Sequence, residues 1–449
     1  MPIGNITSSI ISTLGSPSSL APIIVKDGVV STSLTSYSSK AGGKVEGMDR
    51  AIDEFGTEAI WIGGIPFFKK LIDLTAYKLA KINPDVDIRV AKDKEYATWA
   101  IDNAKGAINK KTGQSVKQAL VDATQNVGKT KSLFVGKVIA ATIMTLASYF
   151  ALTKSKQKFT KGKVEQEIAA NKQKQEKANK QFLDTLEPSN PVFNKIANKN
   201  QASSPSFKGL AQSVADGILF NPVHNMKLID AGITTERLTQ SRNKTEFAEY
   251  SIKEGSFLFF IYGSGYFIQK GFDKMTEKVF KKPINLDIKV LMSDELKKGL
   301  SKNTIKGHIE DVEKVVNKDG SKLTDFLDFV VKNPDNIAVK AAKQSGIIST
   351  VKDSEIVDTS KFIDKKEFMK IAKELKKIDT MFTDSTEDIS KFLNKTKGLK
   401  IAAVLSNIVI CCVCLGKVVP ELMYKYREAK TGSKKFHVAE DIKKAEGAS

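Results

Sequence analysis

Residues 53–90 read DEFGTEAIWIGGIPFFKKLIDLTAYKLAKINPDVDIRV, and residues 253–290 read KEGSFLFFIYGSGYFIQKGFDKMTEKVFKKPINLDIKV. The two stretches align without a gap at a shift of 200 positions. Between residues 52 and 90, 11 of 39 aligned positions are identical, whereas chance at ordinary residue usage gives about 2 or 3. The similarity predicts an internal duplication, so we expect a fold built from two related units.

Each copy is followed by a longer apolar run, LFVGKVIAATIMTLASYFAL at 133–152 and LKIAAVLSNIVICCVCLGKVV at 399–419. The shift between these runs has grown to 262, which indicates an insertion of about 60 residues in the second copy. The clearest element of the insertion is an amphipathic helix that begins at Asp364. Alternating strand patterns are limited to DVDIRV at 85–90 and LDIKV at 286–290, so the predicted class is mainly α.

The predicted organisation follows from these patterns and from the polar segments between them. It comprises a disordered Ser/Thr-rich arm at 1–45; a first repeat unit at 46–153, with a short glycine-broken apolar segment at 58–72 and the run at 133–152; a Lys/Gln/Asn-rich linker with an exposed helix at 154–245; a second repeat unit at 246–431, with apolar segments at 256–272 and 399–419 and a soluble helical insertion at about 296–395; and a basic, polar tail at 432–449.

The two long apolar runs have the length that a membrane-spanning helix needs, which is about 20 residues. Lys137, Lys400 and Lys417 lie near the ends of the runs, where a lysine can extend its ammonium group into water. Lysine clusters follow both runs, as is typical of a cytoplasmic boundary. We therefore expect a membrane protein whose basic flanks face the cytoplasm. The alternative is that the runs form the buried centre of a soluble helical bundle.

The formal net charge is +20, and it comes from 66 lysines but only 5 arginines. Specific reading of nucleic acid and bidentate phosphate binding favour arginine, whereas lysine acts as a hydrated point charge. The lysine excess therefore indicates an anionic membrane surface as a partner rather than a specific nucleic acid.

No motif supports enzymatic chemistry or a bound cofactor. Ala123–Thr130, ATQNVGKT, matches a loose phosphate-loop pattern, but helical spacing precedes it and no acidic strand follows it. Cys411, Cys412 and Cys414 lie together in one apolar run, and the three histidines are far apart in the sequence, so neither a disulfide framework nor a metal site is expected. We predict a non-enzymatic protein without a cofactor or metal.

The candidate site consists of two lysine–aspartate pairs that recur in the two copies: Lys70 with Asp73, and Lys270 with Asp273. Residues three apart share a helix face and can pair. One interpretation is a salt bridge at the membrane edge, and the other is that the pairs line an interface between the repeats, as in duplicated transporters.

Together these patterns favour a membrane-associated scaffold, anchor or membrane-organising protein. The alternatives are a transporter of small solutes or ions that uses the repeat interface, and a soluble bundle that binds partners through lysine-rich surfaces. The expected partners are a lipid membrane and further copies of the chain in a homo-oligomer, with no specific nucleic acid.

Overall fold

The computed structural model describes residues 21–104, 108, 115–183, 222–264, 267–268, 270–271, 274, 285–317, 320–351, 354–385 and 387–435. These residues are mainly helical, which confirms the predicted class, and none of them forms a strand. The remaining β-type contacts among them are two isolated bridges, Ile108 with Ser115 and Thr350 with Val357. Residues 1–20 of the predicted arm, 184–221 of the linker and 436–449 of the tail lie outside the described part.

The two stretches with a strand-like alternation, 85–90 and 286–290, form no strand, because the last three residues of each begin a short helix. Ile88–Lys92 forms α5, and Ile288–Leu291 forms α13. Asp87 and Asp287 are the N-cap residues, and each side chain accepts the backbone N–H two residues later. The caps stabilise a helical turn, while no neighbouring strand in the described part supplies the ladder that a β conformation would need.

The chain divides into two compact units. Unit 1 comprises Met1–Val25, Lys69–Val138 and Ser264–Val409, and unit 2 comprises Lys26–Phe68, Ile139–Gly263 and Ile410–Ser449. Each unit therefore combines segments from both halves of the chain. The long helices α3, α8 and α19 begin in one unit and end in the other, so the division follows packing rather than sequence order.

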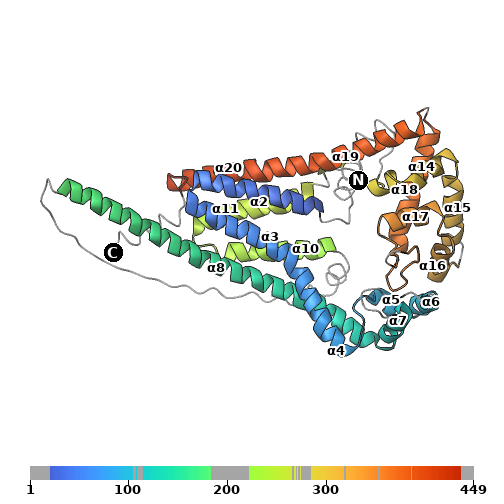
Figure 1. Ribbon diagram of the computed structural model, residues 1–449. Coiled ribbons are helices and arrows are strands. Elements are labelled where there is room, and N and C mark those ends of the chain that lie inside the picture. The colour runs from blue at the N-terminus through green and yellow to red at the C-terminus, as the bar shows by residue number, and fades with distance from the viewer. Residues whose placement is uncertain are drawn as a thin grey trace. The chain divides into compact units, whose positions relative to one another are not determined.

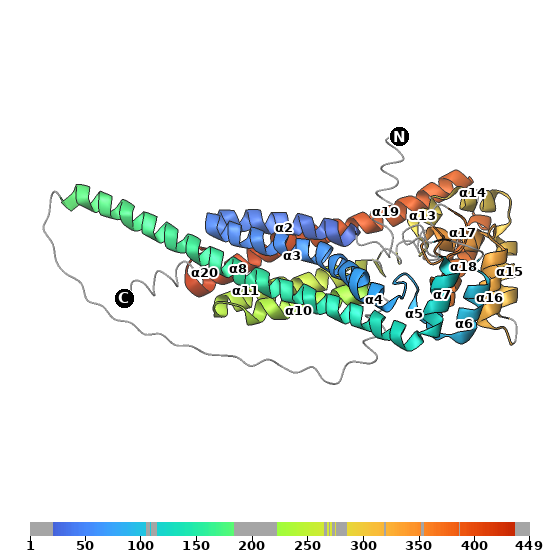
Figure 2. The ribbon, with the colours of Figure 1, turned by 60° about the horizontal axis from the view of Figure 1, so that its bottom comes forward.

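Unit 2 is a bundle of long helices, which lie side by side in both views (Figures 1 and 2). Its α11 packs against α10 and α20. The helices that contribute to it are α2 (Ala21–Ala41), α3 (Lys44–Ile72), α8 (Val127–Leu183), α10 (Pro222–Thr239), α11 (Lys244–Leu258), the π-helix η2 (Phe259–Gly263), α19 (Ile389–Val413), the π-helix η3 (Cys414–Val418) and α20 (Val419–Thr431).

Helix α2 corrects the predicted arm, because Ala21–Ala41 is helical rather than disordered. Serine and threonine disfavour helices by offering the backbone other hydrogen bonds. Here Thr32 and Ser33 donate their hydroxyls to carbonyls four residues earlier, at 2.8 Å each. Val30 and Leu34 are 5% and 2% exposed, so tertiary packing outweighs the weak propensity.

Unit 1 is built from shorter helices that surround an aromatic core. Phe326 and Phe368 meet with ring centroids 5.1 Å apart, and the Trp99 indole Nε1 donates to Asp328 at 2.7 Å. Asp364 caps the predicted amphipathic helix, which confirms that expectation. Besides α5 and α13, the elements are the π-helix η1 (Asp73–Tyr77), α4 (Lys78–Ala80), α6 (Lys94–Asp102), α7 (Val116–Gln125), α14 (Asp294–Ser301), α15 (Ile305–Val316), α16 (Leu323–Lys332), α17 (Ile337–Gln344) and α18 (Lys365–Thr383).

The apolar segment at 58–72 is not interrupted at its glycines. Helix α3 continues through Gly63, Gly64 and Pro66, and η1 and α4 prolong it to Ala80. Single glycines weaken a helix by about 1 kcal/mol each, which packing overrides. This segment is therefore longer than the sequence pattern indicated.

Two helical segments of the described chain are long and apolar enough to cross a membrane, Val127–Gln166 of α8 and Ile389–Thr431 of α19 through α20. Only 22% and 28% of their apolar stretches, respectively, are buried. Ile143 and Val409, for example, are 60% and 58% exposed. Helix α8 also extends through Leu183, so the first part of the predicted linker is helical.

Helix starts recur at nearly the shift seen in the sequence. Helices α3 and α11 begin at Lys44 and Lys244, and α5 and α13 begin at Ile88 and Ile288. Likewise α6 and α14 begin 200 positions apart, and α2 and α10 begin 201 apart.

Candidate functional site

The buried faces of α3 and α11 in unit 2 carry charged residues where a bundle helix ordinarily carries apolar ones. The two faces have the same spacing, with positions 46, 49, 50, 53 and 54 in α3 and positions 246, 249, 250, 253 and 254 in α11. Such a spacing of three and four places the side chains on one side of a helix. Every one of these residues is 6% exposed or less.

Together with cations from neighbouring segments, these residues form a network that we call the buried ionic layer. Seven carboxylates and six cations belong to it: Glu46, Asp49, Asp53, Glu54, Glu246, Glu249 and Glu254, with Arg50, Lys156, Arg237, Arg242, Lys253 and Arg427. The near balance of charge is what allows so many ionised groups to be buried together, because an unpaired buried charge is strongly destabilising.

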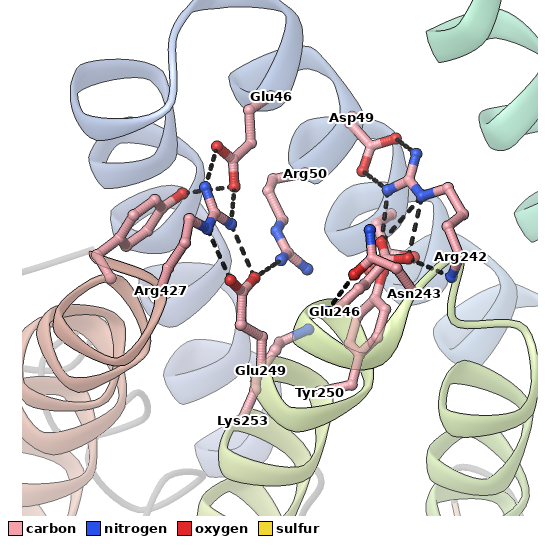
Figure 3. Close-up of polar contacts among 12 residues, drawn as sticks. Glu46, Asp49, Arg50, Arg242, Asn243, Glu246, Glu249, Tyr250, Lys253 and Arg427 are labelled. Atoms are coloured by element: carbon pink, nitrogen blue, oxygen red, sulfur yellow. Dashed lines mark hydrogen bonds and ion pairs between the residues drawn. The ribbon is translucent and has the colours of Figure 1, made fainter. Parts of the chain in front are cut away.

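Arg427 of α20 joins α3 to α11 (Figure 3). Its guanidinium donates two hydrogen bonds to Glu249, both at 2.7 Å, and two to Glu46, at 2.7 and 2.8 Å. The three side chains are at most 1% exposed. Tyr424, one turn earlier, donates its hydroxyl to Glu46 at 2.8 Å. Two-pronged arginine–carboxylate contacts are the strongest and most directional ion pairs in proteins.

Arg242 makes a similar bridge on the other side of the layer, where Figure 3 shows it between Asp49 and Glu246. Its Nη2 lies 2.5 Å from Glu246 Oε1 and 3.3 Å from Asp49 Oδ2. The backbone N–H of Arg242 also donates to Glu246, and the Asn243 side chain accepts the N–H of the same glutamate. The bridge therefore coincides with the N-terminal cap of α11.

Lys156 of α8 adds to the Arg242 bridge at Asp49 and also contacts Asp53 of α3 and Tyr250 of α11. Its Nζ lies 3.1 Å from Asp53 Oδ1, 3.1 Å from the Tyr250 hydroxyl and 3.9 Å from Asp49 Oδ2. Thr160, one turn further along α8, donates its hydroxyl to Asp49 at 2.6 Å. Helix α8 is thereby held to both α3 and α11.

The third part of the layer involves the cations Arg237 of α10 and Lys253 of α11. Arg237 pairs with Glu254 at 2.5 Å and with Asp53 at 3.3 Å. Lys253 forms ion pairs with Glu54 and, at 3.2 Å, with Glu254. All the layer's carboxylates thus have at least one cationic partner.

These contacts lower the pKa of two of the layer's carboxyl groups, Glu246 and Asp53. Burial by itself raises the pKa of Glu246, but hydrogen bonds from Arg242 and the charge of its guanidinium lower that pKa to about 2. Burial likewise opposes ionisation of Asp53, yet Arg237 and Lys156 hold its pKa well below the ordinary value. Paired cations outweigh desolvation at both positions.

The described residues of the predicted site, Lys70, Asp73 and Lys270, do not belong to the buried ionic layer. Asp73 lies in η1 and accepts from Lys137 Nζ at 2.7 Å, and the same ammonium lies 4.7 Å from the centre of the Tyr77 ring. Lys70 and Lys270 are exposed, and Asp273 lies outside the described residues. The structure therefore assigns Lys137, rather than Lys70, as the ion-pair partner of Asp73.

The Gly-Lys-Thr of residues 128–130 lies in the first turn of α8, directly after α7, so it does not form a strand-to-helix loop. Lys129 donates to the carbonyl of Ala80 at 3.1 Å, and Thr130 donates to the carbonyl of Ala123 at 3.2 Å. Within the described part of the chain, no group of three or more Cys, His, Asp or Glu side chains is placed to hold a metal ion.

Sequence reasoning missed the buried ionic layer, although the sequence contains two signals of it. The charges of 46–54 and 246–254 recur at helical spacing, and four of the chain's five arginines belong to the layer. In a chain that otherwise uses lysine, an arginine indicates a position that needs a planar, permanently charged group able to make two-pronged contacts.

No protein-family model, curated protein or solved structure matches this chain. The function must therefore be argued from its own residues.

Proposed function

We propose that the chain is a non-enzymatic membrane protein of duplicated architecture that acts as a scaffold, anchor or membrane-organising component. The observation that carries the proposal is the low burial of its two most apolar helical segments, 22% and 28%. The core helix of a soluble bundle would be mostly buried, whereas a helix in lipid exposes apolar side chains on its outer faces. The soluble-bundle alternative leaves this exposed apolar surface without a role.

The position of the buried ionic layer along each helix agrees with a membrane boundary. In α3 and α11 the charged positions 46–54 and 246–254 precede the apolar segments 58–72 and 256–272. In α8 the apolar run ends at residue 152 and Lys156 follows, and in α20 Arg427 follows the run that ends at 419. Each helix thus passes from apolar to charged residues at the layer. We place the edge of the lipid there, with the exposed lysines beyond it facing the cytoplasm.

The layer also supports the proposed duplication. Arg427 bridges Glu46 and Glu249, while Arg242 bridges Glu246 and Asp49. A shift of 200 positions exchanges the two carboxylate pairs, because 46 corresponds to 246 and 49 to 249. The recurring helix starts point the same way. We infer that the halves derive from one unit that once associated with a second copy of itself.

The dense pairing favours a structural role over a transport role for the layer. Ion pairs with several short hydrogen bonds fix helices in one arrangement, whereas a transport site needs groups that bind and release a solute. The basic stretch of α8 that follows its apolar run, with Lys154, Lys158 and Lys161 exposed, suits contact with anionic lipid headgroups. The transporter alternative is favoured by one feature, a cavity next to the layer that is described below.

The test is membrane fractionation of the full-length chain, followed by alkaline extraction. We expect the protein to remain in the membrane pellet. Ile143→Arg places a charge at an exposed apolar position, where it costs about 2.5–3.5 kcal/mol on insertion, so we expect a lower membrane-embedded fraction. The matched control is Phe159→Arg in the same helix, beyond the apolar run and 39% exposed, which should not change the distribution. Recovery of the wild-type chain in the soluble fraction without detergent would refute the proposal.

A further inference from the structure

Four helices of unit 2 and the segment from η3 into α20 line a partly open cavity of about 40 Å³ beside the buried ionic layer. This is room for a few water molecules. Its polar lining contains five carboxyl groups and two cations, contributed by four helices: Asp27 of α2, Glu54 and Glu58 of α3, Asp230 and Arg237 of α10, and Lys253 and Glu254 of α11. The rest of the lining is mainly apolar and includes Trp61, Phe257 and Leu415.

Both cations of the lining are already paired within the buried ionic layer. Arg237 contacts Glu254 and Asp53, and Lys253 contacts Glu54 and Glu254. These pairs do not involve the carboxyl groups of Asp27, Glu58 and Asp230, which also line the cavity. Among the described residues, no lysine or arginine forms an ion pair with any of these three.

The three remaining carboxyl groups differ in their hydrogen bonds. Asp230 is 7% exposed and accepts the hydroxyl of Tyr262 from η2. Glu58 has a buried oxygen, Oε1, without a hydrogen-bond partner in the described structure. Asp27 faces the cavity from α2. Asp230 is buried and Asp27 is largely shielded from water, and carboxylates without a cationic partner in such surroundings favour the uptake of a positive charge.

We propose that this cavity is a proton-binding site in which Asp27 and Asp230 take up protons delivered by water. Each uptake is a simple protonation, in which a carboxylate oxygen forms an O–H bond while a hydronium ion gives up one of its O–H bonds and leaves as water. A metal ion is a poorer occupant, because no group of three or more suitable side chains in the described residues is arranged to hold one. The inference goes beyond the scaffold role and does not depend on it.

The electrostatic surroundings separate the two aspartates. Burial raises the pKa of Asp27 to about 8, with repulsion from Glu54, Glu58 and Asp230 adding to the effect and Lys253 opposing it. Burial also raises the pKa of Asp230, to about 6, since the Tyr262 hydrogen bond and Arg237 offset part of the effect of burial and of Glu254.

The remaining helices packed around the cavity contribute no further charge to its lining. Tyr149 of α8 interacts with both aspartates, and the segment from η3 into α20 presents apolar side chains. With pKa values of about 8 and about 6, we expect Asp27 to carry a proton at neutral pH while Asp230 is mostly ionised.

The test is infrared difference spectroscopy of the full-length protein in detergent micelles, titrated between pH 5 and pH 9. A protonated carboxyl group has a carbonyl band that a carboxylate lacks. We expect the wild-type band to disappear in two steps, one near pH 8 and one near pH 6. Asp27→Asn should remove the upper step and Asp230→Asn the lower one. Asp311→Asn, at an exposed position of α15 that pairs with Lys314, should leave both unchanged.

Three outcomes would overturn the proposal. The wild-type protein could lack a protonated carboxyl group above pH 5, a result that does not depend on the folding of any variant. The upper step could persist in Asp27→Asn with native helicity by circular dichroism. Finally, Na⁺ or K⁺ at constant pH could abolish the band, which would identify a metal cation as the occupant. None of these results bears on membrane insertion.

Discussion

Replacing Arg427 with methionine tests the central claim that the buried ionic layer holds unit 2 together. Methionine keeps an unbranched side chain but lacks the guanidinium group and its charge. The substitution leaves Glu46 and Glu249, both 0% exposed, without the four hydrogen bonds that Arg427 donates to them. Removal of one partner from a buried ion pair costs about 3–5 kcal/mol, because Glu46 would keep only the Tyr424 hydroxyl and Glu249 only the longer contact with Arg50, at 3.4 Å. We expect a loss of unfolding free energy in that range.

The chain has two tryptophans, Trp61 in unit 2 and Trp99 in unit 1, and this allows the units to be followed separately. In a Trp99→Phe background, the fluorescence of Trp61 reports unfolding of unit 2 alone. The measurement is denaturant-induced unfolding of the detergent-solubilised protein. Arg427→Met should lower the midpoint strongly, and Arg427→Lys should have an intermediate effect, because lysine keeps the charge but cannot form two-pronged contacts.

The matched control is Arg89→Met, which replaces the one arginine of the chain that lies outside the layer. Arg89 pairs with Asp87 two residues away, and its side chain is 35% exposed. Such pairs contribute about 0–1 kcal/mol, so Trp99 fluorescence in a Trp61→Phe background should show little change for unit 1.

The reasoning also predicts strong coupling between Arg427 and Glu249. A double-mutant cycle with Glu249→Gln should recover part of the loss, since the second change removes a buried charge that Arg427 no longer compensates. If Arg427→Met destabilised unit 2 by less than about 1 kcal/mol, the layer would not hold the bundle together, and the argument from desolvation would be refuted.

Three further predictions concern packing, pH and helix caps. Gly56→Val should destabilise unit 2 by about 1–3 kcal/mol, because a Cβ at Gly56 would lie 2.8 Å from the methyl carbons of Leu152 in α8. Gly63→Val should not destabilise it by overpacking, because the space around Gly63 is open. Equal effects of the two substitutions in thermal unfolding would contradict this prediction. The stability that Glu246 contributes is fully present above its ordinary pKa of 4.5 and is lost as the pH falls towards its folded value of about 2. Glu246→Gln should therefore flatten the pH dependence of unfolding between about pH 5 and pH 2, and an unchanged slope would argue against the pairing. Asp87→Ala and Asp287→Ala each remove an N-cap of unit 1 and should lower its free energy of unfolding by about 1 kcal/mol. Unfolding of unit 1 is followed by Trp99 fluorescence. Stability equal to wild type would show that the caps contribute nothing.

The sequence alone was sufficient for the features that depend on local pattern. Helical periodicity predicted the mainly α class and the amphipathic helix capped by Asp364. The length and composition of 133–152 and 399–419 predicted helices that are able to cross a membrane. These features follow from interactions between residues a few positions apart, which the order of amino acids specifies directly.

Features that depend on distant partners were wrong or were not foreseen. Helix α2 was predicted to be disordered, because its serines and threonines are weak helix formers and its packing partners lie elsewhere in the chain. Asp73 was paired on sequence spacing with Lys70, whereas the structure pairs it with Lys137, 64 positions away.

What the sequence determined by itself was an α-helical chain with two long apolar runs, a lysine excess and a similarity between its halves. Only the tertiary structure decided that the charges of α3 and α11 face inward, where they meet cations from three other helices and from the start of α11 itself. A charged residue on a helix is ordinarily solvated, and nothing in its neighbours along the chain says otherwise. Burial became possible because partners up to 381 positions apart in the sequence supply the compensating charges, as Glu46 and Arg427 do.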